Sequence, residues 1–430
     1  MFNFFKKYVV LFVLLLTIFT LSAQEAKNVI YLIGDGMSIS TITLSRIMKE
    51  ASLSFDDFPF VGFASTHSAD ANITDSAAAG TALATGFKTK NGMIGVTPDN
   101  KARKTILEAA KEAGKKVGIV TTTTISHATP ASFTSHVSSR SKEQDIAKQQ
   151  LELKPNVMLG GGLRFFESLF DDAKSAGYDV VLNSEELIKS SNDYVLGVFT
   201  SSHMNYDIDR EASEPSIALM VRKAIDLLNN DKGFFLIVEG GRIDHAAHSN
   251  DPIGTIYDLF AFEKAVKEAY DFARRRKDTL VVVTSDHETG GLVLGRKGYS
   301  FNPEALKNFT NTPDIIVSKI NKEFSDLKEV IKTHTGYDLE DDDVKRMLKH
   351  KDSPRPSRYS AGGLATSSLL WIINNKANIA WTTNDHAGGM VPVYAFGPGA
   401  EKFTGTMDNT DIPKRIFSSF DIKNKVLFPE

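Results

Sequence analysis

Cysteine is absent from this sequence of 430 residues. Disulfide bonds, thiolate catalysis and thiolate metal ligands are therefore excluded, and packing and bound ligands must hold the fold together. Any metal ion must be bound by histidine, carboxylate, hydroxyl or backbone oxygen, which favours metals that accept oxygen and imidazole ligands. This absence narrows both the catalytic chemistry and the kinds of metal site that the chain can form.

The sequence also has little net charge. The formal charge is -3, with 42% hydrophobic and 24% charged residues. This composition is typical of a globular protein. It supplies no broad positive field for nucleic-acid backbones, so we expect no nucleic acid as a specific partner.

Long apolar runs are missing except near the amino terminus. Two lysines precede an apolar run at 8–21, and small residues and the polar Gln24 follow it. This layout is typical of a cleavable secretory signal, and the run is shorter than the roughly 20 apolar residues that span a bilayer. We expect residues 1–23 to be a signal peptide. The mature protein would then be periplasmic or secreted, with no membrane span.

Short apolar runs alternate with helical patterns along the chain. Runs typical of buried strands lie at 28–33, 116–120, 234–238, 279–284 and, more weakly, 379–382. Between them, as at 106–113 and 217–228, apolar residues recur at helical spacing. This alternation predicts an α/β fold with a large, mostly parallel central sheet and helices on both faces. We expect a single catalytic domain over 24–430.

One segment departs from this alternation. Strand patterns nearly vanish from about 303 to 375, and an apolar helical stripe appears at Ile316, Ile320, Phe324, Leu327 and Ile331. A second helix is predicted at 363–373. We interpret this segment as a helical insertion, which is either a lid or added scaffold.

Candidate metal ligands follow the predicted strands. Ligands of open parallel sheets bind outside the carboxyl ends of the strands. The carboxylate and histidine residues at these positions are Asp35, Glu239, Asp244, His248, Asp286, His287, Asp385 and His386. Asp244 and His248 are four apart, so a helix would project both from one face, and His386 could complete that set. A second set would comprise Asp35, Asp286 and His287.

The candidate nucleophile is Ser76, which lies before an alanine-rich helical segment. Thr74, Asp75 or Ser76 could each be only the N-cap of that helix. A serine at a helix start also lies beside backbone N–H groups that suit an anion. Arg140 offers a planar guanidinium that matches two phosphate oxygens, and its alternative is a surface salt bridge.

The remaining histidines carry less information. Five of them are interpreted as ordinary core or surface residues: His67, His136, His203, His334 and His350. His127 and His245 are left open, because each adjoins a candidate site motif.

Taken in order, these motifs resemble those of the alkaline phosphatases. They are 34–37 (GDGM), 74–78 (TDSAA), 128–130 (ATP) with Arg140, 239–245 (EGGRIDH), 286–287 (DH) and 385–386 (DH). Each motif is weak alone, but the ordered set is specific and spans most of the mature chain. The resemblance implies hydrolysis of small phosphate monoesters to alcohol and inorganic phosphate through a phosphoserine at Ser76, by a homodimer.

The resemblance also implies a set of metal ligands. A first zinc would be held by Asp244, His248 and His386. A second zinc would be held by Asp35, Asp286 and His287. A third site would be completed by Thr129 and Glu239 with the shared Asp35, and its oxygen ligands suit magnesium. Arg140 would clamp two nonbridging phosphate oxygens.

Two positions depart from the enterobacterial pattern. His127 and His245 stand where that pattern has aspartate and lysine, and both resemble the animal branch. An imidazole near the third site makes zinc plausible there beside magnesium. Two alternatives stay open: a phosphodiesterase of the same superfamily, and a noncatalytic periplasmic phosphate-binding protein.

Overall fold

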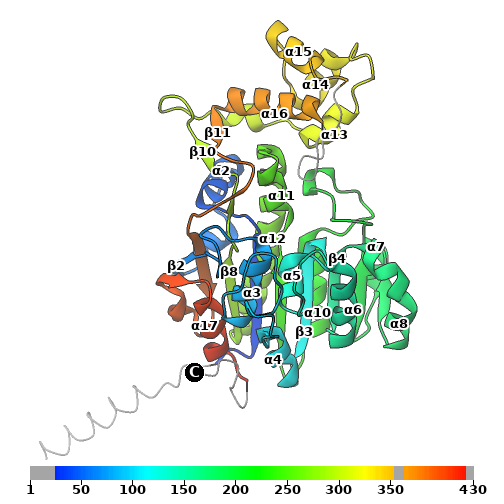
Figure 1. The fold of residues 1–430 in the computed structure, drawn as a ribbon, viewed down its shortest axis with the longest axis vertical. Coiled ribbons are helices and arrows are strands. Elements are labelled where there is room, and N and C mark those ends of the chain that lie inside the picture. Colours follow the sequence, from blue (N-terminus) through cyan, green and yellow to red (C-terminus); the bar gives the residue numbers. More distant parts are fainter. Residues whose placement is uncertain (1–24, 353–362, 423–430) are drawn as a thin grey trace, which may run out of the picture.

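A computed structural model describes residues 25–352 and 363–422. A large sheet carries helices on both faces, and a group of helices lies above one end of it (Figure 1). The predicted signal peptide at 1–23 lies outside the described residues. Within the described ranges, every helix is too short or too polar to cross a bilayer.

The central sheet has ten strands in the order β14-β2-β13-β8-β1-β7-β3-β4-β6-β5. Neighbouring strands run parallel except at β13, which is antiparallel to both β8 and β2. The predicted mostly parallel sheet is therefore confirmed. The strands are β1 (Asn28–Ile33), β2 (Phe60–Ser65), β3 (Lys116–Thr124), β4 (Val157–Gly161), β5 (Asp179–Val181), β6 (Val195–Val198), β7 (Phe234–Glu239), β8 (Thr279–Thr284), β13 (Val391–Phe396) and β14 (Gly405–Asp408).

The central strands are mostly apolar on both sides, as expected where helices cover both faces of the sheet. In β1, Val29, Tyr31 and Ile33 pack into the core on one face. Ile30 and Leu32 pack into the core on the other face. All residues of β1, β7 and β8 are buried. These strands form a rigid support for the residues that follow them.

The helices predicted at 106–113 and 217–228 are α4 (Ile106–Glu112) and α10 (Ile217–Leu228). Thr105 and Glu108 form a capping box at the start of α4, and the Ser216 side chain caps α10. The other helices that matter for the site are α2 (Ile39–Lys49), α3 (Ser76–Thr85), α5 (Ala128–Ser132), α11 (Arg242–His248) and α12 (Pro252–Arg276).

The described residues between 303 and 375 form helices and no strand. These helices are η4 (Pro303–Leu306), α13 (Pro313–Ser318), α14 (Leu327–Thr335), α15 (Asp341–Leu348) and α16 (Leu364–Ala377). The predicted apolar stripe packs inside this group, together with Leu44 of α2 and Ile253 of α12. These contacts anchor the group above the sheet, at the top of Figure 1.

The weak strand predicted at 379–382 does not join the main sheet. Instead, β11 (Ile379–Trp381) pairs with β10 (Leu292–Leu294), and β12 (His386–Ala387) pairs with β9 (Glu288–Thr289). The chain then enters the main sheet as the antiparallel β13, whose amino end lies at the edge where parallel strands have their carboxyl ends. His386 thus reaches this edge before an antiparallel strand, and not after a parallel one as predicted.

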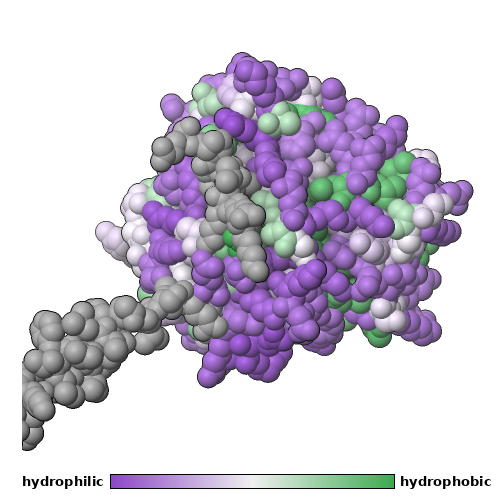
Figure 2. All heavy atoms as spheres, turned by 90° about the horizontal axis from the view of Figure 1, so that it is seen from below, coloured by the Kyte–Doolittle hydropathy of each residue, from purple (hydrophilic) through white to green (hydrophobic). Residues whose placement is uncertain are grey.

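The end of the molecule opposite the helical group is mostly hydrophilic. Figure 2 views this end, where polar side chains cover most of the face and hydrophobic ones gather in limited patches. A surface of this kind suits contact with water.

Candidate functional site

Three groups of potential metal ligands meet at one edge of the sheet. Within each group the ligand atoms lie within 4.8 Å of one another. The first group is Asp244, His248 and His386. The second is Asp35, Asp286 and His287. The third is Asp35, His127 and Glu239. Because Asp35 belongs to two groups, the second and third groups adjoin.

The sheet and the short helix α11 bring most of these residues together. Asp35 and Asp286 follow the adjacent strands β1 and β8, and Glu239 ends β7 on the other side of β1. Asp244 and His248 lie one helical turn apart in α11, so both face the same side. The prediction that a helix aligns these two residues is confirmed.

Two glycines allow the segments to approach closely. Gly36 has φ of 69°, and a Cβ there would lie 2.9 Å from both the Cα and Oδ1 of Asp244. A Cβ at Gly80 would lie 2.8 Å from Ser132 Oγ and 3.4 Å from Thr129 Cα, so α3 and α5 pack closely there. Only glycine fits either position without displacing the site.

In the first group, the Nδ1 atom of each histidine has a defined partner. His248 Nδ1 lies 2.5 Å from the carbonyl oxygen of Asn384, and His386 Nδ1 lies 2.8 Å from that of Thr74. Since a carbonyl only accepts, each Nδ1 carries the proton and donates it. The two Nε2 atoms face each other at 3.1 Å, so one cation could be bound by both rings.

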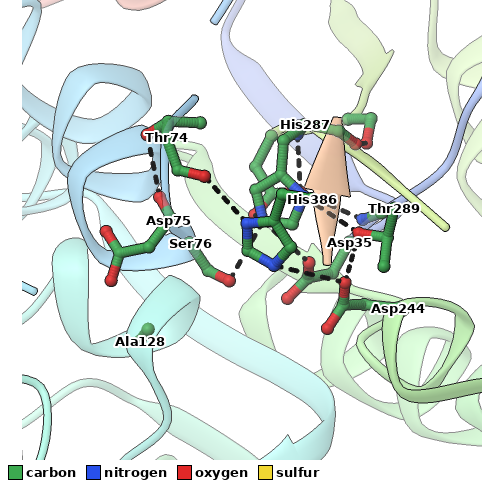
Figure 3. A network of polar contacts seen from close by, with 12 residues as sticks. Asp35, Thr74, Asp75, Ser76, Ala128, Asp244, His287, Thr289 and His386 are labelled. Atoms are coloured by element: carbon green, nitrogen blue, oxygen red, sulfur yellow. Dashed lines mark hydrogen bonds and ion pairs between the residues drawn. The ribbon is translucent and has the colours of Figure 1, made fainter. Parts of the chain in front are cut away.

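Ser76 is the first residue of α3 and is 2% exposed. The helix is capped by Asp75, whose side chain accepts a hydrogen bond from Ala78 N at 2.9 Å. The Ser76 hydroxyl is therefore not used for capping. It lies 3.1 Å from His287 Nε2, beside the second group (Figure 3). Of the three capping alternatives, Asp75 is the one observed.

Arg140 points into the same region. Its guanidinium donates to Asp75 Oδ2 at 3.1 Å, and its Nη2 lies 3.1 Å from His127 Nε2. The N-cap of the Ser76 helix thus also orients the arginine. The alternative of an isolated surface salt bridge does not describe this arginine, which contacts two residues of the site.

Several buried polar atoms of the site lack a hydrogen-bond partner. They are both carboxylate oxygens of Asp35, Asp286 Oδ2, Glu239 Oε1, Thr129 Oγ1 and His127 Nδ1. Burial, together with the charge of Asp286, raises the pKa of Asp35 well above its ordinary value. Burial also raises the pKa of Glu239. Unpaired buried carboxylates are costly, so this set of donors fits bound cations.

A third histidine lies beside His127 and His245. The ring of His203 makes edge contacts with both, at centroid distances of 5.2 Å and 4.6 Å. Burial and the nearby charges of Arg242, Arg164 and Arg140 lower the pKa of His203 to about 3, so this imidazole is neutral. His203 belongs to none of the three ligand groups, which agrees with its interpretation as an ordinary histidine.

The other predicted residues are placed as follows. His136 pairs with Glu108 at 2.9 Å, and His67 lies 3.7 Å from Asp408. Both contacts are away from the three groups and agree with ordinary structural roles. Asp385 is exposed and belongs to none of the groups. Thr289 was also missed, although its hydroxyl donates to Asp244 Oδ1 at 2.5 Å.

Comparisons with known proteins identify the family of the chain. The family model described as alkaline phosphatase matches residues 26–422. Alkaline phosphatase 4 of Bacillus subtilis is 40% identical over 414 residues, which cover 91% of this chain and 88% of that protein. Alkaline phosphatase of Escherichia coli is 32% identical over 74% of this chain and 81% of its own length.

Comparisons with solved structures indicate the same family. A cold-active alkaline phosphatase from Shewanella is 32% identical, with a TM-score of 0.86 over 91% of this chain and 99% of that one. A second structure is a histidine-to-aspartate mutant of the alkaline phosphatase of the Antarctic bacterium TAB5, with magnesium bound in the M3 site. It is 26% identical, with a TM-score of 0.70, and the match covers 94% of this chain and all of that one. The chain therefore belongs to the alkaline phosphatase family and is an enzyme of that class.

Proposed function

We propose that this enzyme hydrolyses small phosphate monoesters through a covalent phosphoserine at Ser76, beside two zinc ions and a third cation. The observation that carries the proposal is the position of the Ser76 hydroxyl. This hydroxyl lies at a helix amino terminus but does not cap the helix, because Asp75 does so. It lies 3.1 Å from His287 Nε2, within reach of the second ligand group.

The side chains divide the chemistry between them. The Ser76 oxygen would form a bond to phosphorus as the bond to the leaving alcohol oxygen breaks. Arg140 would hold two nonbridging oxygens, since its guanidinium is already oriented by Asp75 and His127. Backbone N–H groups at the start of α3 would add to the stabilisation of the phosphoryl group. Water would then attack phosphorus and return the serine with release of inorganic phosphate.

The ligand groups fit the metals that the family resemblance implies. The first group offers one carboxylate and two imidazoles, and the second offers two carboxylates and one imidazole, which are ligand types of catalytic zinc. Zinc bound there would supply Lewis-acid chemistry: it would lower the pKa of an attacking hydroxyl and neutralise charge on the leaving oxygen.

The third group would take magnesium or zinc. Asp35, Thr129 and Glu239 offer oxygen atoms, which suit magnesium. Thr123 Oγ1 donates to Glu239 Oε2 at 2.8 Å and Thr121 also donates to it, so the carboxylate is oriented. His127 adds an imidazole, which suits zinc. The magnesium bound in the M3 site of the TAB5 mutant supports magnesium as a candidate for this site.

The reaction class is tested by comparing esters. We expect purified enzyme to release phosphate from p-nitrophenyl phosphate with a kcat/KM at least about 100-fold above that for bis-p-nitrophenyl phosphate, a difference of about 2.7 kcal/mol. The reason is that Arg140 and the cations would favour the more highly charged monoester. A higher kcat/KM for the diester would favour the phosphodiesterase alternative. Turnover of neither ester would favour a noncatalytic binding protein.

Replacing His245 with lysine should tighten inhibition by inorganic phosphate. Burial and the charge of Arg242 hold the pKa of His245 well below its ordinary value, so this residue carries no charge in the native protein. A lysine would add one positive charge near the phosphate position. We expect the inhibition constant to fall by about tenfold, or about 1.4 kcal/mol, which is the size of a partly screened charge pair.

The measurement is competitive inhibition of p-nitrophenyl phosphate hydrolysis by phosphate. The matched control is His67→Lys, because His67 is half-exposed and lies away from the three groups. This control should leave inhibition unchanged. An unchanged inhibition constant in His245→Lys would contradict the expectation.

Location and assembly are further proposals. The signal-like segment at 1–23 supports a periplasmic or secreted enzyme. A homodimer is supported by the family resemblance alone. Cell fractionation and light scattering of the purified enzyme test these two statements separately.

A further inference from the structure

Thr289 lies between the first and second ligand groups. It belongs to β9, where it pairs with His386 of β12, and it is fully buried. Its hydroxyl oxygen lies 2.5 Å from Asp244 Oδ1 and 3.2 Å from His287 Nδ1 (Figure 3). One hydroxyl therefore contacts a ligand of the first group and a ligand of the second.

The directions of these two hydrogen bonds follow from the groups involved. A carboxylate accepts hydrogen bonds only, so the single hydroxyl proton of Thr289 goes to Asp244. The threonine oxygen must then accept from His287, which puts the ring proton on Nδ1. The Nε2 atom then carries a lone pair, and Nε2 lies 3.1 Å from Ser76 Oγ, 3.1 Å from Asp286 Oδ2 and 3.5 Å from Asp35 Oδ1, where a cation of the second group would bind.

This arrangement differs from that at the other two ligand histidines. The Nδ1 atoms of His248 and His386 are held by backbone carbonyls, which no substitution removes. Only His287, among these three, relies on a side chain. The stacking of His287 on His386, at a centroid distance of 3.5 Å, keeps the rings parallel but does not determine which nitrogen carries the proton.

The surroundings leave Thr289 little freedom. A Cβ at Gly36 would lie 2.9 Å from the threonine oxygen, so the backbone of the loop after β1 packs directly against it. Neither a larger side chain nor a different rotamer fits easily in such a space. The hydroxyl is thus held in the position where it serves both partners.

We propose that Thr289 is a positioning residue that couples the two ligand groups, because its one hydroxyl orients Asp244 in the first and fixes the ring tautomer of His287 in the second. The proposal rests on the metal sites of the proposed function. It implies that loss of this hydroxyl weakens both sites together, although Thr289 itself binds neither cation.

The test compares Thr289→Val, which keeps the shape and removes the hydroxyl, with Thr289→Ser, which keeps the hydroxyl. Zinc affinity is measured by competition with a chromophoric chelator in excess magnesium, so the readout does not depend on activity. We expect both tightly bound zinc ions to be held about 10–100-fold more weakly in Thr289→Val, as found when a residue that supports a metal ligand is removed. Thr289→Ser should restore wild-type affinity, and kcat should fall more than KM rises in the valine variant.

Two further variants keep the test decisive. Thr289→Ala removes the same hydroxyl without a branched side chain and replaces the valine variant if that one does not fold. Thr335→Val removes a buried hydroxyl in α14 that donates to Ile331 O at 2.8 Å, and it should leave zinc binding unchanged.

The outcomes separate this inference from the proposed function. Wild-type protein without bound zinc would overturn the proposed metal site and the inference with it. Zinc-loaded wild type with unchanged affinity in Thr289→Val would overturn the inference alone. Weakening of only one zinc ion would also overturn it, because the coupling requires both.

Discussion

Replacing Ser76 with alanine should lower kcat for phosphate monoesters by on the order of 10⁴-fold or more, as when other enzymes lose a nucleophilic hydroxyl. The variant keeps the ligand groups, because Ser76 belongs to none of them and Asp75 caps the helix. Alanine also has the highest helix propensity, so it is suited to this position in α3. The loss should therefore appear in kcat, with metal content and folding retained.

The matched control for this experiment is Ser45→Ala. Ser45 is a fully buried serine of α2 whose hydroxyl has no hydrogen-bond partner, so its removal should leave turnover within about twofold. Acid quenching during turnover should trap radiolabelled phosphate on wild-type enzyme and not on Ser76→Ala. Full hydrolysis by Ser76→Ala would refute the assignment of the nucleophile.

Removal of the cations should lower the melting temperature by on the order of 10 °C. Asp35, Asp286 and Glu239 are each fully buried and lie close together. Without a cation their charges repel and lack solvation. A cation present at 1,000 times its Kd contributes about 4 kcal/mol to stability, and 1 kcal/mol corresponds to about 2–4 °C for a domain of 150–250 residues. One such site alone therefore accounts for a shift of about 8–16 °C, and further occupied sites would add to it.

Asp35→Asn separates charge repulsion from general loss of a ligand. Its side chain keeps the shape of aspartate and removes a buried carboxyl whose pKa is raised by burial and by the charge of Asp286. In chelated protein, this variant should melt a few degrees above chelated wild type, although it should be inactive when metals are restored. Equal melting temperatures of wild type with and without chelator, or a lower one for chelated Asp35→Asn, would contradict this explanation.

Much of the site could be predicted because strand ends mark it. Asp35, Glu239 and Asp286 follow or end apolar runs, and runs of this kind become parallel strands whose carboxyl ends share an edge. The helical spacing of Asp244 and His248 likewise determines that both face one side. These features depend on local pattern, which a sequence displays directly.

What could not be predicted depends on contacts between distant segments. The direction of β13 is decided by how the chain returns after the helical group. The prediction that His386 reaches the site after a parallel strand was therefore wrong. Thr289 acts through a hydrogen bond to Asp244, 45 positions away, which no local pattern indicates.

The central claim is that buried carboxylates and histidines bind cations that make the Ser76 hydroxyl reactive toward phosphorus. Its most direct test is elemental analysis of purified enzyme, with p-nitrophenyl phosphate hydrolysis measured before and after chelation. We expect about two zinc ions per chain, as two ligand groups of zinc type require, with loss of activity on chelation and its return when zinc and magnesium are added. Full turnover by protein from which every metal has been removed would contradict the account.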